Sequence, residues 1–418
     1  MDHHYFVLVI LSLIFANMLP FLSAENENII AGIEDYEDPN AGNANAGAAM
    51  EAYNPELLEA SLQRNTSRSD RLECAESNPI DMCWRGKADW ADNRQALVQC
   101  VIGFAKGTTG GAAGEIYTVT DPSDADGANP KEGTLRWGAA QKKPLWIIFE
   151  KDMVIVLKHT LVVTSDKTID GRGARVEIAY GGGITIQEAN NVIIHGISVH
   201  DVRVMDGFAG RSACDGDALT IKTASKIWID HCDFSKGPDG LLDVTVGSTA
   251  VTISNNRFHD HDKVVLLGAD DSHTEDKMMR ATVAYNRFEE TCTQRMPRCR
   301  FGFFQVVNND YNKWKMYAIG GSANPTILSQ GNRFVASDNP NTKKVLQRNY
   351  AEESEWKNWN WRSEKDVLEN GAIFIASGVD PQLTPEQQEG MIEVAPGELV
   401  PQLTSSAGVL SCVVGQPC

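Results

Sequence analysis

The feature that most constrains the fold is a short strand pattern that recurs between residues 191 and 334. Each copy is a run rich in β-branched residues followed by a polar bend, which often carries Asn. The copies are 191–198 (NVIIHGIS), 226–234 (KIWIDHCDF), 250–258 (AVTISNNRF), 281–288 (ATVAYNRF), 305–311 (QVVNNDY) and 325–334 (PTILSQGNRF). Strands that recur roughly every two dozen residues, with longer intervals at inserted loops, are typical of a solenoid. Asn side chains stacked at the bends would satisfy one another and the bend backbone.

A β-sandwich is the main structural alternative. It would need hairpin turns such as Asn-Gly between strands at intervals of roughly 8–12 residues, and these turns are not evident. We therefore predict an all-β fold for residues 78–418, a right-handed single-stranded parallel β-helix filled by Ile, Val and Leu ladders. The apolar spacing in 92–105 predicts one short helix, with Asp92 or Asn93 as N-cap. We expect this helix to cap the open N-terminal end, since solenoids need caps.

The only long apolar run, residues 5–23, lies at the extreme N-terminus. It ends at the small residues Ser23 and Ala24, which is typical of a signal peptide rather than a membrane span, although its start has no Lys or Arg. We therefore interpret 1–24 as a signal peptide and expect a secreted protein of the extracellular space or cell wall. A glycosylation sequon at Asn65 is consistent with that route.

Secretion makes disulfides possible for the nine cysteines. Short separations favour four pairs, with Cys74 left over: Cys83–Cys100, Cys214–Cys232, Cys292–Cys299 and Cys412–Cys418. A sequence does not determine connectivity, so other pairings stay open.

The net charge of −18 argues against a nucleic-acid binder, which needs a basic surface. Half of this charge lies in residues 25–77, which hold twelve acidic and three basic residues. We interpret 25–77 as a solvated segment that is either flexible or removed as a pro-region. The rest of the chain is far less acidic, and it shows no zinc, P-loop or HExxH spacing.

Two short acidic motifs lie about one coil apart. Asp215-Gly-Asp217 precedes one strand, and Asp239-Gly-Leu-Leu-Asp243 follows the bend after that strand. One solenoid turn would bring the motifs side by side, and converging carboxylates repel one another unless a hard cation such as Ca²⁺ binds among them. The alternative is that both motifs only form turns, and the residues alone leave both interpretations open.

Basic residues gather farther along the chain, at Lys263, Arg295, Arg298 and Arg300. In a net-acidic protein, such a group in the same part of the solenoid suggests a groove for an acidic ligand. A bound Ca²⁺ would invert the local charge, so the acidic motifs do not oppose this interpretation. Solvated or ion-paired arginines are the alternative.

Many ordered motifs across residues 78–418 resemble those of plant pectate lyases, especially the subgroup that includes pollen pectate lyase allergens. They are WRGKADWADNR (84–94), NPKEGTLRWGAAQKKPLWIIFEKDM (129–153), TIDGRGA (168–174), DGDALTI (215–221), IWIDHCDFS (227–235), DGLLD (239–243), VTISNNRF (251–258), QRMPRCRFG (294–302), VVNNDY (306–311), MYAIGGSANPTILSQGNRF (316–334) and LTSSAGVLSC (403–412). The acidic segment 25–77 lies outside the resemblance.

The resemblance implies a parallel β-helix that cleaves de-esterified homogalacturonan by Ca²⁺-dependent β-elimination and leaves a 4,5-unsaturated galacturonate end. Matched motif by motif, it implies that Asp215, Asp239 and Asp243 bind calcium and that Asp217 assists. It also implies that Arg295 is the catalytic base and that the substrate-binding bases are Lys263 and Arg300. We interpret His231, Trp228 and the Trp cluster of 356–361 as structural.

The implied reaction removes the C5 proton of galacturonate, which is only weakly acidic. Cations around the neighbouring carboxylate would stabilise the enolate-like transition state. A guanidinium is nearly always protonated, so two routes stay open. Either crowded cations lower the pKa of Arg295, or Arg295 stabilises charge while hydroxide takes the proton. Both routes predict activity that rises toward alkaline pH.

Two other functions compete with this one. A polygalacturonase would hydrolyse the same polymer with a pair of carboxylates, but it gives no role to the basic residues. A catalytically weak pectin-binding wall protein or pollen allergen is the non-enzymatic alternative. In either case we expect a polygalacturonate or pectin partner, no nucleic acid, no membrane in the mature form, and a monomer.

Overall fold

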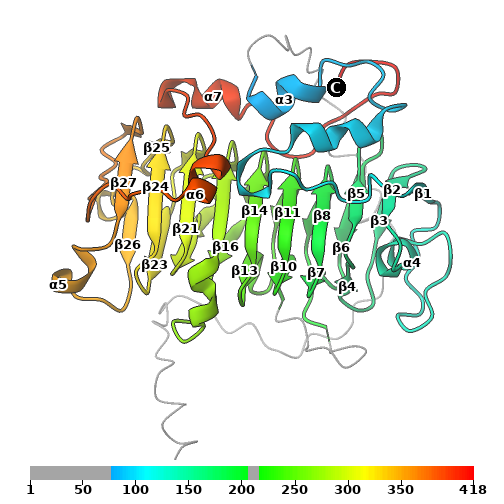
Figure 1. Ribbon diagram of the computed structural model, residues 1–418, viewed down its shortest axis with the longest axis horizontal. Coiled ribbons are helices and arrows are strands. Elements are labelled where there is room, and N and C mark those ends of the chain that lie inside the picture. The colour runs from blue at the N-terminus through cyan, green and yellow to red at the C-terminus, as the bar shows by residue number, and fades with distance from the viewer. Residues whose placement is uncertain (1–76, 206–215) are drawn as a thin grey trace, which may run out of the picture. The chain divides into compact units, whose positions relative to one another are not determined.

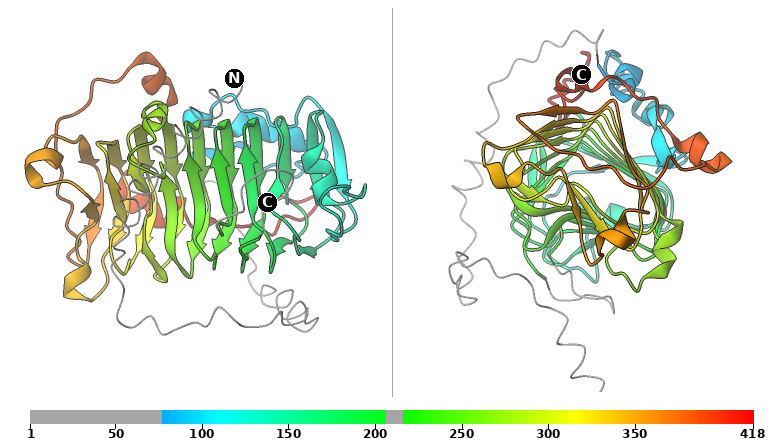
Figure 2. Two further views of the ribbon diagram at one scale, coloured as in Figure 1. Left: turned by 90° about the horizontal axis from the view of Figure 1, so that it is seen from below. Right: turned by 90° about the vertical axis from the view of Figure 1, so that its left-hand side faces the viewer.

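The computed structural model describes residues 77–205 and 216–418, which belong to one compact unit. In these residues the chain winds through three sheets in turn, and the hydrogen-bonded pairs of named strands are parallel (Figures 1 and 2). Each coil adds one strand to each sheet, so neighbours in a sheet come from successive coils. The predicted parallel β-helix is confirmed.

Sheet 1 contains ten strands and receives the first strand of each coil. They are β1 (Glu115–Val119), β2 (Leu145–Phe149), β5 (Lys167–Asp170), β8 (Asn190–His195), β11 (Ser225–Asp230), β14 (Thr249–Ser254), β17 (Arg280–Ala284), β21 (Phe303–Val307), β24 (Thr326–Gln330) and β27 (Trp361–Glu364).

Sheet 2 follows after a tight bend and has shorter strands. They are β3 (Met153–Ile155), β6 (Val176–Ala179), β9 (Ser198–His200), β12 (Asp233–Ser235), β15 (Arg257–His259), β18 (Arg287–Phe288), β22 (Asp310–Asn312), β25 (Arg333–Val335) and β28 (Val367–Glu369).

Sheet 3 completes each coil and carries the candidate site. Its strands are β4 (Leu161–Val162), β7 (Ile184–Gln187), β10 (Leu219–Lys222), β13 (Gly240–Thr245), β16 (His261–Leu267), β19 (Cys292–Gln294), β20 (Arg298–Arg300), β23 (Ile319–Ser322) and β26 (Leu346–Arg348). Both β19 and β20 pair with β16, because one coil bulges between them.

The bend between sheets 1 and 2 holds the predicted Asn stack. Each member after the first accepts a hydrogen bond from the backbone N–H of the member one coil before it, and sequence separations along the stack are 24, 30, 23, 23 and 34 residues. The members are Cys232, Asn256, Asn286, Asn309, Asn332 and Asp366. Because the amides also bond to one another, the ladder satisfies buried polar groups at every coil and fixes the strand register.

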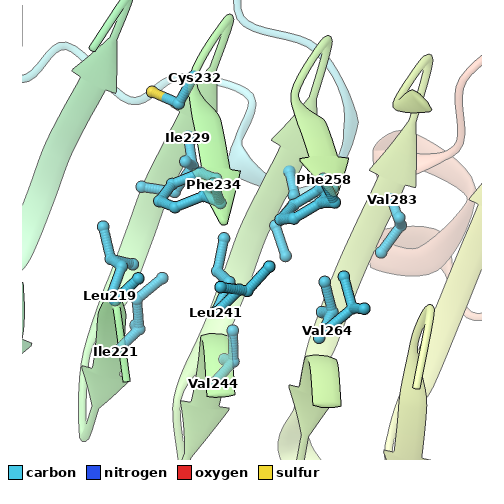
Figure 3. Packing of buried hydrophobic residues seen from close by; sticks show 14 of the residues in the cluster. Leu219, Ile221, Ile229, Cys232, Phe234, Leu241, Val244, Phe258, Val264 and Val283 are labelled. Carbon is cyan, nitrogen blue, oxygen red and sulfur yellow. The ribbon is translucent and has the colours of Figure 1, made fainter. Parts of the chain in front are cut away.

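Apolar ladders fill the interior of the coils, as predicted. Next to the Asn ladder, five aromatic rings stack with centroid separations of 5.5, 5.1, 4.8 and 4.6 Å: Phe234, Phe258, Phe288, Tyr311 and Phe334. Figure 3 shows two of these rings with the aliphatic side chains from neighbouring strands. Offset or edge-on aromatic contact adds to the free energy of burial, so this row stabilises coil stacking.

The short helix at the N-terminal end is α4 (Leu135–Ala140), which buries Leu135 and Ala139 against the first coils (Figure 1). The position predicted for it was wrong. Arg94–Cys100 forms a 3₁₀ helix that packs with α3 (Pro79–Trp84) on the outer face of sheet 1. The apolar spacing of this segment does correspond to a buried side. That side packs on Trp146 and other outward-facing residues of sheet 1, rather than on the open end of the coils.

The remaining helices are short. They are α5 (Glu353–Trp356), α6 (Pro385–Gly390), α7 (Val400–Leu403) and the 3₁₀ helices Gly103–Ala105, Thr274–Met278, Pro340–Thr342 and Gly397–Leu399. None of the described helices is both long and apolar enough to cross a membrane.

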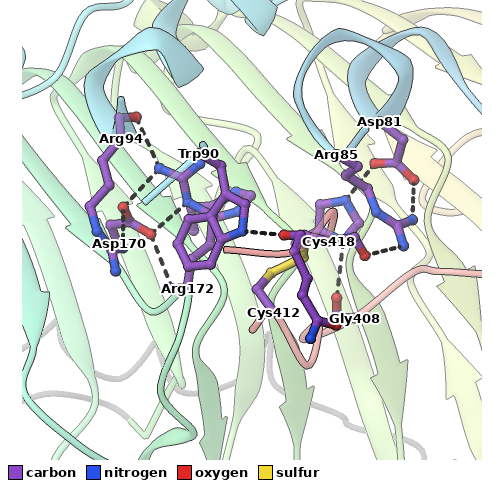
Figure 4. The surroundings of a disulfide bond; sticks show 12 residues. Asp81, Arg85, Trp90, Arg94, Asp170, Arg172, Gly408, Cys412 and Cys418 are labelled. Carbon is purple, nitrogen blue, oxygen red and sulfur yellow. Dashed lines mark hydrogen bonds and ion pairs between the residues drawn. A yellow bond between two sulfur atoms is a disulfide. The ribbon is translucent and has the colours of Figure 1, made fainter. Parts of the chain in front are cut away.

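The C-terminal tail also lies over sheet 1, beside the N-terminal segment (Figure 4). The indole of Trp90 donates to the Gln416 carbonyl at 3.0 Å, and Arg85 donates to the Cys418 carbonyl at 2.9 Å. Two segments more than three hundred residues apart therefore form one cover over the outer face of this sheet.

Two of the four expected disulfides are confirmed, Cys83–Cys100 and Cys412–Cys418. The pair Cys292–Cys299 is wrong: Cys292 lies opposite His261 and Cys299 opposite Leu267, six residues along β16, or roughly 20 Å. A disulfide tolerates only about 7 Å between Cα atoms.

The pair Cys214–Cys232 is also wrong. Cys232 carries a free thiol inside the coil, and burial raises its pKa to about 12. Cys74, Cys214 and Asn65 lie outside the described residues, as do residues 1–24, predicted as a signal peptide, and almost all of the acidic segment.

Candidate functional site

The residues expected to act gather where β13 and β16 begin. An open pocket of about 400 Å³ lies there, and two adjacent coils line it with Lys236, Gly237, Pro238, Asp239, Asp260, His261, Asp262 and Lys263. The strand register places Gly240 opposite Lys263 and Asp243 opposite Leu266. Strands in a sheet are about 4.8 Å apart, so the side chains on these two coils are direct neighbours.

Two of the aspartates face each other across Gly240. A Cβ atom at Gly240 would lie 2.7 Å from Oδ1 of Asp217 and 2.7 Å from Oδ1 of Asp243. Only glycine therefore lets both carboxylates approach this backbone. Asp217 is buried, and it accepts hydrogen bonds from the Gly240 N–H at 2.8 Å and from the Thr220 hydroxyl at 3.1 Å. It consequently supports the turn into β13 as well as facing Asp243.

Asp239 joins this group to the basic residues. Its Oδ1 accepts a hydrogen bond from Lys263 Nζ at 2.9 Å, and both side chains are partly exposed. The ring of His261 donates to the Asp239 carbonyl at 2.7 Å, and burial lowers the pKa of His261, which favours the neutral ring. The carboxylate is therefore presented at the pocket surface beside one ammonium group.

The acidic groups fit a hard cation by their chemistry. Asp217, Asp239 and Asp243 offer carboxylate oxygens, which Ca²⁺ prefers, and the gap above Gly240 is space that any larger residue would fill. Asp215 lies outside the described residues. Within 77–205 and 216–418, no three His, Cys, Asp or Glu side chains are grouped closely enough to hold a metal by themselves.

Arg295 lies in the bulge between β19 and β20. Its φ of +61° is in the left-handed region, which turns the chain out of the strand, and its carbonyl still accepts from the Val265 N–H at 2.6 Å. The guanidinium contacts the buried phenol of Tyr317, whose pKa is raised by burial and lowered in part by Arg298 and Arg295. Its Nε is buried without a hydrogen-bond partner among the described residues. Arg295 is thus a cation on this sheet whose hydrogen-bond donors are only partly paired within the protein.

Arg300 is held more firmly. Its Nε donates to Oδ1 of Asp271 at 2.7 Å, and its Nη1 donates to the Gly268 carbonyl at 2.7 Å. Ser322 donates to the same Asp271 oxygen at 2.6 Å. Burial lowers the pKa of Arg300, and the charges of Arg298 and Arg295 lower it further, which places all three guanidinium groups in one neighbourhood.

Sequence reasoning missed Asp271 and His261 as parts of this site. Asp271 lies in a polar loop that reads as a turn, and only its position under Arg300 reveals its role. Asp262 and Lys263, which follow His261, are recognisable as the start of a strand. The bond of His261 to Asp239 can be predicted only when the stacking of the coils is known.

His231 and the tryptophans lie elsewhere, as expected for structural residues. His231 is fully buried on sheet 1, where it donates to Asp81 at 2.7 Å and to the Gly408 carbonyl at 3.0 Å. Burial alone would lower its pKa, but Asp81 and Asp230 reverse this and raise it. Trp228, Trp359 and Trp361 are buried, and Trp356 is packed on the core.

This chain is similar to known pectate lyases. A family model described as pectate lyase matches residues 92–377. Pectate lyase 4 of Ambrosia artemisiifolia is 58% identical over 363 residues, which cover 85% of this chain and 91% of that protein. A pectate lyase of Lilium longiflorum is 50% identical over 371 residues, with coverages of 86% and 85%.

A solved structure supports the same conclusion. The crystal structure of the major allergen from cedar pollen is 44% identical, has a TM-score of 0.77, and covers 80% of this chain and 100% of its own. The matched region includes the three sheets and the strands that carry the aspartates and arginines. The chain therefore belongs to the pectate lyase family, within the group of plant pollen pectate lyases and related allergens.

Proposed function

We propose that this protein is a secreted pectate lyase that cleaves (1→4)-α-D-galacturonan by calcium-dependent β-elimination and leaves 4,5-unsaturated galacturonate ends. The observation that carries the proposal is the meeting of three basic side chains with carboxylates on one face of sheet 3. Lys263 is bonded to Asp239, and Arg295 and Arg300 lie one strand away. An anionic polymer whose carboxylates need a bridging metal suits this arrangement.

Calcium is assigned to the carboxylate group. Asp239 and Asp243 would hold the ion together with Asp215, and Asp217 would assist from beneath Gly240. A bound Ca²⁺ supplies positive charge to a substrate carboxylate, which acidifies the carbon next to it. The net negative charge of the bare site would otherwise repel pectate, so the ion also explains how an acidic region accepts an acidic polymer.

The basic residues carry the chemistry. Lys263 and Arg300 bind the carboxylate of the sugar that is cleaved and hold it in one orientation. The C5 proton is removed toward Arg295, and the electron pair of the C–H bond forms the C4–C5 double bond. The C4–O bond breaks, its electron pair leaves with the glycosidic oxygen, and that oxygen takes up a proton from water. Arg295 acts on this proton as the base or by stabilising charge while hydroxide removes it. Asp271 holds Arg300 in place through the 2.7 Å bond.

The test is an elimination assay. The mature protein is incubated with polygalacturonate, and the ultraviolet absorbance of the conjugated double bond is followed with added Ca²⁺, with EDTA, and after Ca²⁺ is restored. We expect absorbance to rise only when calcium is present. New reducing ends without that absorbance would indicate hydrolysis by a polygalacturonase. If neither reducing ends nor absorbance appear, the protein only binds pectin. Either result contradicts the proposal.

Secretion and processing complete the proposal. We propose that residues 1–24 are removed on export, that residues 25–77 form an acidic extension, and that residues 78–418 fold as the lyase domain and act as a monomer. Asn65 would be glycosylated in that extension. The confirmed disulfides Cys83–Cys100 and Cys412–Cys418 support an oxidising compartment.

A further inference from the structure

Arg298 is a buried cation for which the reaction has no role so far. Only 6% of its surface is exposed, and its Nε and Nη2 atoms are buried without a hydrogen-bond partner in the described part of the chain. Its guanidinium carbon lies 5.5 Å from the ring of Tyr350. Burying a guanidinium without a counter-charge costs free energy, so this arrangement calls for an explanation.

The carboxylates near Arg298 are already occupied. Asp271 bonds Arg300 at 2.7 Å and Ser322 at 2.6 Å, and Asp262 receives the amide of Gln294 at 3.4 Å. No ion pair between Arg298 and an acidic side chain is found in residues 77–205 and 216–418. An acceptor for the buried nitrogens of Arg298 would have to come from outside the protein, and the exposed ring of Tyr350, which lies over the guanidinium, would have to move aside to admit it.

The position of Arg298 on sheet 3 suggests what that acceptor is. Arg298 lies opposite Leu266 on β16, and Leu266 lies opposite Asp243 on β13. Arg298 and the calcium-binding candidate Asp243 thus share one row, two strands or roughly 10 Å apart. Arg298 and Arg300 both point outward from β20, because Cys299 between them faces the core. A short stretch of an anionic polymer can reach both points.

Tyr350 completes the surroundings. It lies just after β26, has φ of +58°, and is 80% exposed although it is large and aromatic. Its flat face is available to a sugar ring beside the guanidinium that it covers. Tyr317, which is 2% exposed, also lies close enough for the charge of Arg298 to lower its pKa, against the effect of burial. Arg298 therefore has one buried ring and one exposed ring as neighbours.

The geometry points to Arg298 as a second residue that binds a carboxylate of the polymer. The uronate that Arg298 binds is a neighbour of the one being cleaved. This inference rests on the proposed function and refines it: Arg298 selects chains whose neighbouring sugars are de-esterified, because a methyl ester cannot accept two charge-assisted hydrogen bonds. Tyr350 packs on the sugar that carries this carboxylate.

The test compares Arg298→Gln and Arg298→Lys with the unaltered protein, and uses Arg287→Gln on sheet 2 as a matched control. Initial rates are measured on polygalacturonate and on partly methyl-esterified pectin. For Arg298→Gln we expect KM on polygalacturonate to rise about tenfold or more while kcat changes little, as for loss of one charged hydrogen bond. The preference for de-esterified substrate should shrink. Arg298→Lys should recover part of the affinity, and Tyr350→Ala should raise KM by a smaller factor.

Unchanged KM and unchanged substrate preference in a well-folded Arg298→Gln protein would overturn the inference and leave water as the occupant. Equal losses of kcat on both substrates, together with a lower Tm, would also overturn it by indicating a structural role. If the unaltered protein yields no unsaturated product, the proposed function has failed. Calorimetric titration with trigalacturonate then decides separately: weaker binding by Arg298→Gln supports the inference, and equal binding refutes it.

Discussion

The outer faces of sheet 1 and sheet 3 both carry buried charges, but two arginines of sheet 3, Arg295 and Arg298, have no acidic partner among the described residues. On sheet 1, Asp170 accepts hydrogen bonds from Arg94 at 3.0 Å, from Arg172 at 2.8 Å and from the Trp146 indole at 2.9 Å. Although burial would raise the pKa of Asp170, the two arginines hold it well below its usual range. On sheet 3, Arg295 and Arg298 keep buried nitrogens without hydrogen bonds in the described residues.

This difference distinguishes charged groups that stabilise the fold from charged groups that are available to bind a ligand. On sheet 1 the ion pairs attach the N-terminal and C-terminal segments to the coils, and Arg85, Arg94 and Arg172 each have an aspartate from the same chain as counter-charge (Figure 4). Single nitrogens of Arg85 and His195 lack a hydrogen-bond partner there, but the charges are balanced. On sheet 3, Arg295 and Arg298 have no acidic partner among the described residues, and a buried cation without a counter-charge is costly unless a ligand supplies one.

The largest expected effect is on turnover, and it follows removal of a charge from sheet 3. Arg295→Ala should lower kcat by about a hundredfold to ten-thousandfold, because it removes the group closest to the migrating proton. Tm should fall only slightly, since the fold loses the bond of the guanidinium to Tyr317 but no ion pair among the described residues. Elimination rates and thermal unfolding check this, with Arg287→Ala as the control. Wild-type turnover in Arg295→Ala would remove Arg295 from the mechanism.

The largest expected effect on stability follows the same kind of change on sheet 1. Asp170→Ala should lower the free energy of unfolding by about 3–5 kcal/mol, because it leaves Arg94 and Arg172 buried without their counter-charge. Urea unfolding measures this, and activity per folded molecule should be preserved. The matched control is Glu389→Ala, which removes an exposed 3.7 Å contact with Lys106 and should cost less than about 1 kcal/mol. A similar cost in both variants would contradict the comparison.

The coil architecture could be predicted because its signal repeats. Copies such as 250–258 and 281–288 carry Asn256 and Asn286 at the same place, and these residues do bond to each other. A pattern that recurs at every coil predicts each strand and also the strand of the next coil with which it pairs. The end cap at α4 does not repeat. The apolar face of a helix predicts that the helix is buried, but it does not predict which surface the helix packs on.

The site could be predicted only in part, for a related reason. Asp239, Lys263 and Arg295 carry recognisable motifs, so their roles follow from resemblance. The bond between Arg300 and Asp271 and the unpaired state of Arg298 depend on distances between coils, which no motif encodes. Cysteine pairing failed in the same way, since Cys292 and Cys299 are close in sequence and far apart along β16.

A smaller stability effect tests whether the bend ladder acts as one network. Asn286→Leu should destabilise the protein by about 2–3 kcal/mol, because the backbone N–H and amide of Asn256 lose their acceptor at 2.9 and 3.0 Å. Chemical unfolding is the measurement. Asn358→Leu, at an exposed position with one long 3.3 Å bond, serves as the control and should change stability by less than about 0.5 kcal/mol. Equal effects would show that the ladder contributes no more than a surface residue.

The smallest effect concerns Asp366, where the ladder ends in a carboxylate instead of an amide. Burial raises the pKa of Asp366 to about 6, although four hydrogen bonds from Ser363, Ser329 and Asn332 oppose the shift. An unfolded Asp titrates near 3.9, so between roughly pH 4 and 6 the folded state binds more protons, and stability falls as the pH rises through that window. Asp366→Asn removes this charge and should raise stability at pH 7 by about 1–2 kcal/mol, with no gain at pH 4. Tm measured against pH for both proteins checks this, and parallel curves would show that Asp366 is already satisfied as a carboxylate.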